Sequence, residues 1–478
     1  AGINTYLGYD SLLRLSTPTR LENEVRGSFN VAGWSHYRSV AVISAREDSK
    51  LPRYTLLSTD NDGQFNGVVW LTDGPGRYTV NVAILVPGDP TYKIVCAFNV
   101  TNTSRETPLC PIEYKGYGTD LVIHSPRGPS NVVTDSITIY GWSQYRRVQA
   151  TVQNLATGEM RVYYAFTNEE GLFDLPLPLD VGSGECEIKI ASRQTGENTW
   201  RGAAVYRVVV EPPPIHVTEP AYQFGTIFAT GRFRMAGTAL SKVVRLDLSP
   251  YEPEHSPPLR STEIRVDTST GSWEAWVDPP TAVESFRVSV ASVDEKTGAP
   301  VSPRSYAVRM VKPRPEPSKA EKWVAQSVYQ SIQKASRDIL AGISDRYAAT
   351  MAVHDWVAKN IAYDVAGFRN RSPGPTDALS TLAKRESICL GYSNLTAALL
   401  RAAGIPVWVV VGMVDIGDHL MKHAWNEVEV NGRIVLLDTT WDSGYSDGPK
   451  FVRRFTRQYY DPSPELFSVT HIQGIDNS

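Results

Sequence analysis

The chain has 478 residues, of which 42% are hydrophobic and 21% are charged, and its formal net charge is -3. This length is too great for one hydrophobic core and predicts several domains of about 100–200 residues each. The ordinary composition, the lack of an apolar run of about 18 residues and the near-neutral charge exclude disorder, a membrane span and bulk attraction to nucleic acid.

Residues 1 to about 315 have the pattern of β-strands joined by turns. Short runs rich in Val, Ile, Thr, Tyr and Phe are separated there by clusters of Gly, Pro, Asn and Asp. A repeat lies within this region. The run from Gly33 to Val40 (GWSHYRSV) returns from Gly141 to Val148 (GWSQYRRV), and 141 minus 33 gives an offset of 108 residues. A third, more divergent copy begins near Pro220.

The period of this repeat predicts the domain architecture. About 100 residues of short strands is the size of an immunoglobulin-like or fibronectin-like sandwich, in which two sheets bury alternate side chains against each other. Proline-rich linkers at residues 211–214 and 312–317 mark two boundaries. We therefore expect a multidomain chain that begins with three all-β, immunoglobulin-like sandwiches, at residues 1–108, 109–212 and 213–315.

The chain has four cysteines, Cys96, Cys110, Cys186 and Cys389. Their spacing is not that of a structural zinc site. Cys96 and Cys186 fall on predicted core positions of strands, although a disulfide between Cys96 and Cys110 also remains open. Trp34 and Trp142 recur at one place in the repeat, so we interpret them as packing residues rather than as a platform for a sugar ring.

After the second linker the hydrophobic period becomes helical. Ser318 and Glu321 form a capping pattern before apolar residues spaced three to five positions apart, and a second helix is expected from about Ser344. His354 lies among the apolar residues of that second helix. We interpret it as a core or groove histidine rather than as a catalyst.

Cys389 is expected in the first turn of a helix. Ser387 is a plausible N-cap, apolar positions continue to Ala402, and Gly404 follows at the end. At a helix start the unpaired backbone amides and the positive end of the helix dipole favour a thiolate over a thiol. The position suits a sulfur nucleophile, and from position alone a buried structural cysteine is an equally good interpretation.

A hairpin downstream supplies an imidazole and a carboxylate. Asn431-Gly432 between two alternating runs predicts a two-residue turn in which Val430 faces Arg433. Counting back along both strands, His423 and Asp438 project from one face as diagonal neighbours within hydrogen-bonding reach. Sulfur, imidazole and carboxylate are the groups that a thiol nucleophile requires.

Two other assignments of these residues are disfavoured. His419 and His423 could suggest a metal site, but the segment lacks the glutamate of the HExxH zinc signature, so we predict neither a metal nor another cofactor. Asp442 could assist or replace Asp438, but strand alternation places Asp438 on the face of His423 and Asp442 beyond the strand.

The segments ESICLGYS, HAWNEV and NGRIVLLDTTWD, with the later run from Tyr459 to His471, resemble the bacterial transglutaminase-like superfamily. The resemblance covers residues 316–478 and implies a papain-like α+β fold in which Cys389, His423 and Asp438 correspond to the catalytic triad. It further implies cysteine-dependent acyl transfer on protein or peptide amides through a thioester, as in a peptidase or a transglutaminase.

Other expectations are less specific. Tyr363 is a candidate oxyanion donor, and Trp425 and Trp441 could wall the substrate cleft, although all three could equally be packing residues. The β modules resemble accessory domains of bacterial extracellular or cell-surface proteins and could bind a wall or surface ligand. The chain starts at Ala1 without a signal peptide, which fits a mature secreted protein or a trimmed chain. The alternative function is a non-catalytic surface binding or structural protein.

Overall fold

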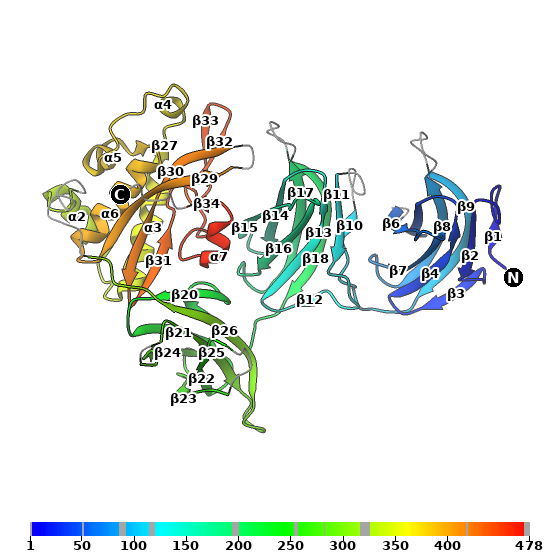
Figure 1. Cartoon of the computed structure of the whole chain (residues 1–478), viewed down its shortest axis with the longest axis horizontal. Helices are drawn as coiled ribbons and strands as arrows, with labels where there is room; N and C mark the ends of the chain where they lie inside the picture. Colours follow the sequence, from blue (N-terminus) through cyan, green and yellow to red (C-terminus); the bar gives the residue numbers. More distant parts are fainter. Residues whose placement is uncertain are drawn as a thin grey trace. The chain divides into compact units, whose positions relative to one another are not determined.

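The computed structural model describes residues 2–49, 52–85, 92–113, 120–193, 200–252, 257–281, 283–315, 326–416 and 419–472. The chain divides into two compact units, residues 1–212 and residues 213–478 (Figure 1). The capping pattern predicted at Ser318 and Glu321 lies outside the described residues.

Module 1, comprising strands β1 to β9, has two sheets around one core. The smaller sheet has the order β2-β4-β7, and the larger has the order β1-β9-β8-β5-β6 with β3 beside β9. Side chains from both sheets, including Val31 and Val82, form the core. The strands are β1 (Asn4–Thr5), β2 (Leu13–Thr17), β3 (Glu22–Val25), β4 (Ser28–Ser35), β5 (Ser39–Arg46), β6 (Pro52–Ser58), β7 (Gln64–Trp70), β8 (Gly76–Leu85) and β9 (Tyr92–Asn102).

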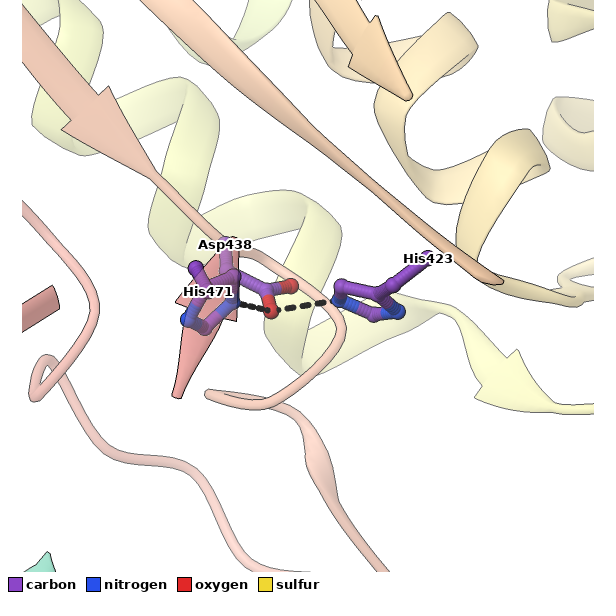
Figure 2. Close-up of side chains that lie close together, drawn as sticks. All are labelled: His423, Asp438 and His471. Carbon is purple, nitrogen blue, oxygen red and sulfur yellow. Dashed lines mark hydrogen bonds and ion pairs between the residues drawn. The ribbon is translucent and has the colours of Figure 1, made fainter. Parts of the chain in front are cut away.

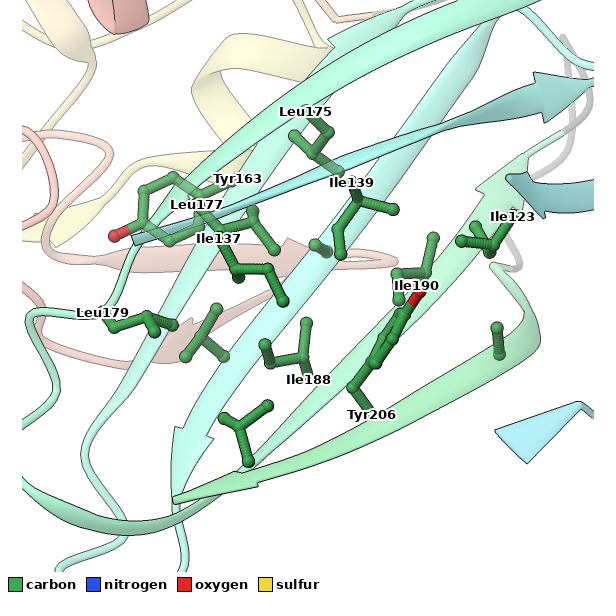
Figure 3. Packing of buried hydrophobic residues seen from close by; sticks show 14 of the residues in the cluster. Ile123, Ile137, Ile139, Tyr163, Leu175, Leu177, Leu179, Ile188, Ile190 and Tyr206 are labelled. Atoms are coloured by element: carbon green, nitrogen blue, oxygen red, sulfur yellow. The ribbon is translucent and has the colours of Figure 1, made fainter. Parts of the chain in front are cut away.

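Module 2, comprising β10 to β18, repeats this arrangement at the predicted spacing. Its β13 begins at Ser136 where β4 begins at Ser28, and 136 minus 28 is again 108. The sheets are β11-β13-β16 and β10-β18-β17-β14-β15 with β12 beside β18. Figure 3 shows Ile139 of the smaller sheet and Ile190 of the larger sheet in the shared core. The strands are β10 (Ile112–Glu113), β11 (Leu121–Ser125), β12 (Val132–Val133), β13 (Ser136–Ser143), β14 (Arg147–Asn154), β15 (Met160–Phe166), β16 (Leu172–Pro178), β17 (Gly184–Arg193) and β18 (Arg201–Val210).

Two cysteines and one tryptophan of these modules have packing roles. Cys96 and Cys186 are buried in the two cores, as predicted. Cys96 and Cys110 are not joined to each other, so the disulfide that the sequence left open is not formed. The indole of Trp142 donates a hydrogen bond to the carbonyl oxygen of Glu170 at 3.1 Å, which supports its interpretation as a packing residue.

The second unit begins with module 3, comprising β19 to β26. Its smaller sheet is β19-β21-β24, and β23-β22-β25-β26-β20 forms the other layer. Both layers contribute to one core that includes Phe233 and Val288. The strands are β19 (Ile215–Glu219), β20 (Gly225–Ala229), β21 (Phe233–Ala239), β22 (Val243–Pro250), β23 (Arg260–Arg265), β24 (Ser272–Val277), β25 (Ser285–Val293) and β26 (Pro300–Met310).

The C-terminal region, residues 326–472, combines helices with an antiparallel sheet. The sheet order is β31-β30-β29-β34. The helices are α2 (Gln330–Ile339), α3 (Arg346–Asn360), α4 (Val365–Arg369), α5 (Ala378–Lys384), α6 (Cys389–Ala402) and α7 (Pro464–Ser468). The strands are β27 (Ala362–Tyr363), β28 (Glu386–Ser387), β29 (Val407–Asp415), β30 (Leu420–Val430), β31 (Arg433–Leu437), β32 (Gly444–Asp447), β33 (Lys450–Arg453) and β34 (His471–Ile472).

Alternation along the strands separates the two faces of this sheet. Val428 and Val435 face the helices and join the core formed by α2, α3 and α6. Trp425 and Leu436 project from the opposite face into a small aromatic cluster. The predicted α+β architecture is therefore present, and the sheet face with His423 is distinct from the main core.

A single ladder joins module 3 to the C-terminal region. Strand β20 pairs with β26 on one side and with β31 on the other, where Ala229 lies opposite Arg433. The resulting long sheet runs β23-β22-β25-β26-β20-β31-β30-β29-β34. The hairpin that the sequence singles out is consequently the link between the two parts of this unit.

Among the described residues, none of the helices is both long and apolar enough to span a bilayer.

Candidate active site

Cys389 is the first residue of helix α6, as the sequence predicts for the first turn, and its side chain is buried, with 8% exposed. The N-cap is Ile388 rather than the predicted Ser387. Ser387 belongs instead to the short strand β28, whose parallel pairing with β27 places it opposite Tyr363. This pairing holds Tyr363 beside the start of α6.

The hairpin brings His423 and Asp438 together. Val430 pairs with Arg433 in the predicted register, and Asn431 and Gly432 both have positive φ, at 49° and 80°, as a type I′ turn requires. Figure 2 shows the two side chains in contact, with His423 Nε2 2.7 Å from Asp438 Oδ2. The predicted hydrogen bond is therefore confirmed, and Nδ1 is the ring nitrogen left for another partner.

Cys389 is that second partner. Burial opposes a charged ring at His423, but the Asp438 carboxylate, through its charge and hydrogen bond, and then Cys389, through a side-chain hydrogen bond and its charge, raise the pKa of His423 to about 10. The ordinary value is 6.5. At neutral pH the His423 ring is therefore protonated on both nitrogens and positively charged. It lies between the Cys389 thiol group and the Asp438 carboxylate.

Asp438 is held through both carboxylate oxygens. Oδ1 accepts hydrogen bonds from the backbone amides of Thr440 at 2.9 Å and Trp441 at 3.2 Å. Oδ2 accepts from His423 and from His471 Nε2 at 3.1 Å. Burial alone would raise the pKa of this carboxyl, but the two histidines outweigh it and hold the pKa below the usual range. Asp438 is thus a fixed anion.

His471 is a member of this cluster to which the sequence assigned no role. It lies on β34, where it pairs with Val414 of β29. Burial lowers its pKa, so the ring is neutral at neutral pH. Strand β34 is two residues long and its partner β29 is far away in sequence, so no local pattern could have placed His471 beside Asp438.

Asp442 serves a different histidine. Its Oδ2 is 2.9 Å from His354 Nε2 and accepts the backbone amide of Tyr459 at 2.8 Å. His354 is fully buried, as predicted, but its surroundings are charged, because Asp355 lies 3.3 Å from its Nδ1. The preference for Asp438 over Asp442 as the partner of His423 agrees with this geometry.

The aromatic candidates occupy different environments. Trp425 is buried, and its ring lies 5.8 Å from Phe467 in the aromatic cluster, so it packs the sheet. Trp441 is half-buried, with its ring 5.6 Å from His423. Tyr363 pairs with Ser387, two residues before Cys389, and burial and then the charge of Cys389 raise the pKa of its phenol.

His423, Asp438 and His471 also have a spacing that could hold a metal ion, since their ligand atoms lie within 4.8 Å of one another. The hydrogen bonds already described account for this spacing. His419, which the sequence considered with His423, is exposed and outside this group.

Comparison with known proteins identifies the type of the C-terminal domain. The family model described as "Transglutaminase-like superfamily" matches residues 333–439 of the chain. The C-terminal region is a transglutaminase-like domain. Kyphoscoliosis peptidase of Homo sapiens is 32% identical over 139 residues, which cover 26% of this chain and 21% of that protein. The Mus musculus protein of the same name is 28% identical over 164 residues, covering 32% and 24%. The chain thus spans about a fifth to a quarter of the length of these relatives.

Solved structures give only distant matches. A candidate cysteine protease from Cytophaga hutchinsonii has a TM-score of 0.21 at 12% identity, covering 64% of this chain and 74% of that one. A candidate protease from Parabacteroides distasonis has a TM-score of 0.19 at 11% identity, covering 64% and 66%. At these TM-scores neither match adds to the argument, which rests on the transglutaminase-like domain and its side chains.

Proposed function

We propose that the chain is a cysteine-dependent acyl-transfer enzyme that acts on protein or peptide amides, as a peptidase or as a transglutaminase. The observation that carries the proposal is the series of Cys389, His423 and Asp438, in which one imidazole faces a thiol and a carboxylate. The peptidase names of the two mammalian relatives support it.

In the first step Cys389 acts as the nucleophile and His423 holds its proton, while the Asp438 carboxylate orients and stabilises the imidazolium. The high pKa of His423 favours a preformed thiolate–imidazolium pair. Sulfur attacks the amide carbonyl carbon and a C–S bond forms. His423 then protonates the leaving nitrogen, the C–N bond breaks, and a thioester remains with ammonia or an amine released.

In the second step an acceptor attacks the thioester and gives a proton to His423. The S–C bond breaks, the acyl product leaves, and the Cys389 thiolate and the His423 imidazolium are restored. Water as acceptor gives hydrolysis, whereas a lysine amine gives an isopeptide cross-link.

The negative charge on the carbonyl oxygen requires donors close to Cys389. The first backbone amides of a helix lack intrahelical acceptors, so the amide of Cys389 is one proposed donor. The phenol of Tyr363, a residue that pairs with Ser387 beside the start of α6, is the second proposed donor. Half-buried Trp441 is the proposed wall of the cleft, where it would limit access of water to the thioester.

The β modules extend this proposal to the rest of the chain. Their two-sheet cores and the offset of 108 residues from Ser28 to Ser136 support three immunoglobulin-like sandwiches. We propose that they display the domain outside the cell or at its surface and bind a wall or surface ligand. Detection of the native protein in the cytoplasmic fraction would contradict this location.

The first test is the reactivity of Cys389 toward iodoacetamide at neutral pH, read by mass spectrometry of the labelled peptide. We expect Cys389 to react faster than the thiol of free cysteine in the same solution, which serves as the reference. His423→Ala should remove that advantage, and His419→Ala, at an exposed position on the same segment, should not. Labelling of Cys389 no faster than free cysteine would favour a non-catalytic binding protein.

The second test separates the two reactions. The chain is incubated with a glutamine-containing peptide and a primary amine, and the products are weighed. Incorporation of the amine indicates a transferase, whereas cleavage of the peptide chain indicates a peptidase. Neither product from any of a panel of peptides would contradict the proposed substrate class.

A further inference from the structure

His471 is a second imidazole on the Asp438 carboxylate, and the proposed mechanism does not use it. Its Nε2 lies 3.1 Å from Asp438 Oδ2, the same oxygen that lies 2.7 Å from His423 Nε2 (Figure 2). One carboxylate oxygen therefore joins two histidines that come from different strands.

The sheet brings both rings to the same face. His423 of β30 pairs with Gly412 of β29, and His471 of β34 pairs with Val414 of β29. Residues 412 and 414 project from one face because strand side chains alternate with a period of two. Gly412 has no side chain on this face of the sheet. A β-carbon added there would overlap the Trp425 ring. The ring centroids of His423 and His471 consequently lie only 5.7 Å apart.

Aromatic packing fixes the orientation of His471. Its ring stacks on Phe467 with a centroid distance of 3.8 Å and an interplanar angle of 17°, and Trp441 lies 4.7 Å away. Only 4% of the residue is exposed. Such a buried ring can change rotamer only by displacing its neighbours.

The Asp438 carboxylate favours the tautomer of the neutral ring with its proton on Nε2, because an ionised carboxylate can only accept hydrogen bonds. Thr470 Oγ1 lies 2.9 Å from His471 Nδ1. When Nδ1 accepts the threonine proton, the ring proton resides on Nε2 and is donated to Asp438 Oδ2. His471 is then a neutral donor, while His423, on the same oxygen, is the charged partner.

We propose that His471 is a positioning residue that holds the Asp438 carboxylate in the orientation His423 needs. Backbone amides hold only Oδ1. The Nε2–H of His471 fixes Oδ2 from the side opposite His423 and prevents rotation of the carboxylate. The inference rests on the proposed function, since it assigns His471 a role in preparing the Cys389–His423 pair.

The test compares His471→Leu, which removes the donor, with His471→Gln, whose side-chain amide can donate from a similar place. In the full chain, His471→Leu should slow iodoacetamide labelling of Cys389 at neutral pH on the order of 10- to 100-fold, as for a small misplacement of a reacting group. The pKa of His423, followed by NMR titration, should fall from about 10 toward its ordinary value. His471→Gln should retain most of both properties.

Two outcomes would overturn the inference. One is an unchanged His423 pKa in His471→Leu with a lower melting temperature, which would make His471 a packing residue alone. The other is equal loss in the Leu and Gln variants. If His471→Leu does not fold, Thr470→Val removes the hydroxyl at Nδ1 without disturbing the ring stack and should shift the His423 pKa in the same direction. No shift there would count against the inference.

The same measurements distinguish the two proposals. If wild-type Cys389 reacts no faster than the thiol of free cysteine, the proposed function fails. The NMR titration of His423 in the two His471 variants does not depend on catalysis and still decides what His471 does.

Discussion

At Asp438 a single carboxylate contacts two histidines that have different protonation states. His423 donates at 2.7 Å and its pKa is raised to about 10, whereas burial keeps the pKa of His471 below its ordinary value. Pairs of groups whose pKa values are driven apart are typical of acid–base sites. The charge of Asp438 is therefore the quantity on which the protonation of His423 depends.

Asp438→Asn should lower the pKa of His423 from about 10, because the neutral amide no longer attracts the imidazolium and burial disfavours the charged ring. The alkaline limb of any pH–rate profile should move to lower pH with it. NMR titration of the His423 ring measures the shift directly. Asp442→Asn is the matched control, since it removes the carboxylate from His354 and should leave the His423 pKa in place.

The pair of His423 and Asp438 makes the stability of the folded chain depend on pH. The raised pKa of His423 contributes stability that is fully present below pH 6.5 and is lost as the pH rises through about 10. The lowered pKa of Asp438 contributes stability that is present above pH 3.8 and is lost in more acidic solution. Both contributions are fully present between pH 3.8 and pH 6.5. In that range the free energy of unfolding of the wild-type chain should exceed that of Asp438→Asn most clearly. A constant difference at every pH would contradict this linkage.

At the scale of the elements, the hairpin of β30 and β31 is held from outside at its turn. The backbone amide of Thr230 donates to the carbonyl oxygen of Gly432 at 2.8 Å, and that of Arg234 donates to Asn431 at 3.0 Å. Asn431 also donates through its side chain to Glu219 at 2.9 Å. Module 3 thus fixes the turn from which the positions of His423 and Asp438 are counted.

Gly432→Ala should lower the free energy of unfolding of the second unit by more than the cost of placing an alanine at a positive φ. A β-carbon at Gly432 would overlap the carbonyl oxygen of Arg232. Gly448 is the matched control, because it also has positive φ, at 56°, but has no atom within 4 Å of an added β-carbon. Left-handed strain should cost both variants about 1–2 kcal/mol, and the overlap should add about 1–3 kcal/mol for Gly432→Ala. Equal losses in chemical denaturation would show that the turn is not clamped.

Local patterns predicted the pairing in this hairpin but not its surroundings. Asn431-Gly432 and strand alternation suffice to place His423 beside Asp438, because both signals lie within a few residues of each other. The position of His471 depends on the pairing of β34 with β29, and the position of Arg433 depends on the pairing of β31 with β20. Both pairings join segments that are far apart in the sequence. Ile388 replaces Ser387 as the N-cap because Ser387 is taken up by the pairing with β27.

At the scale of the whole second unit, one buried carboxylate connects module 3 to the transglutaminase-like domain. Asp461 accepts from Arg433 Nη1 at 2.8 Å and Nη2 at 2.5 Å. It also accepts from the Tyr347 hydroxyl at 2.7 Å and from the backbone amide of Ala221 in module 3 at 3.0 Å. Strand β31, helix α3 and module 3 therefore share this group, in addition to the ladder between β20 and β31.

Asp461→Asn should lower the free energy of unfolding of residues 213–478 by about 3–5 kcal/mol, because it leaves the buried Arg433 charge without its counterion. Arg433 is fully buried. Asp338→Asn is the control. It breaks the exposed pair of Lys334 and Asp338, with side chains 71% and 61% accessible, and should cost about 0.5 kcal/mol or less. If module 3 and the transglutaminase-like domain are one cooperative unit, spectroscopic probes in both parts should report the same shifted transition in Asp461→Asn. Separate transitions, with module 3 unaffected, would show that the shared sheet does not couple them.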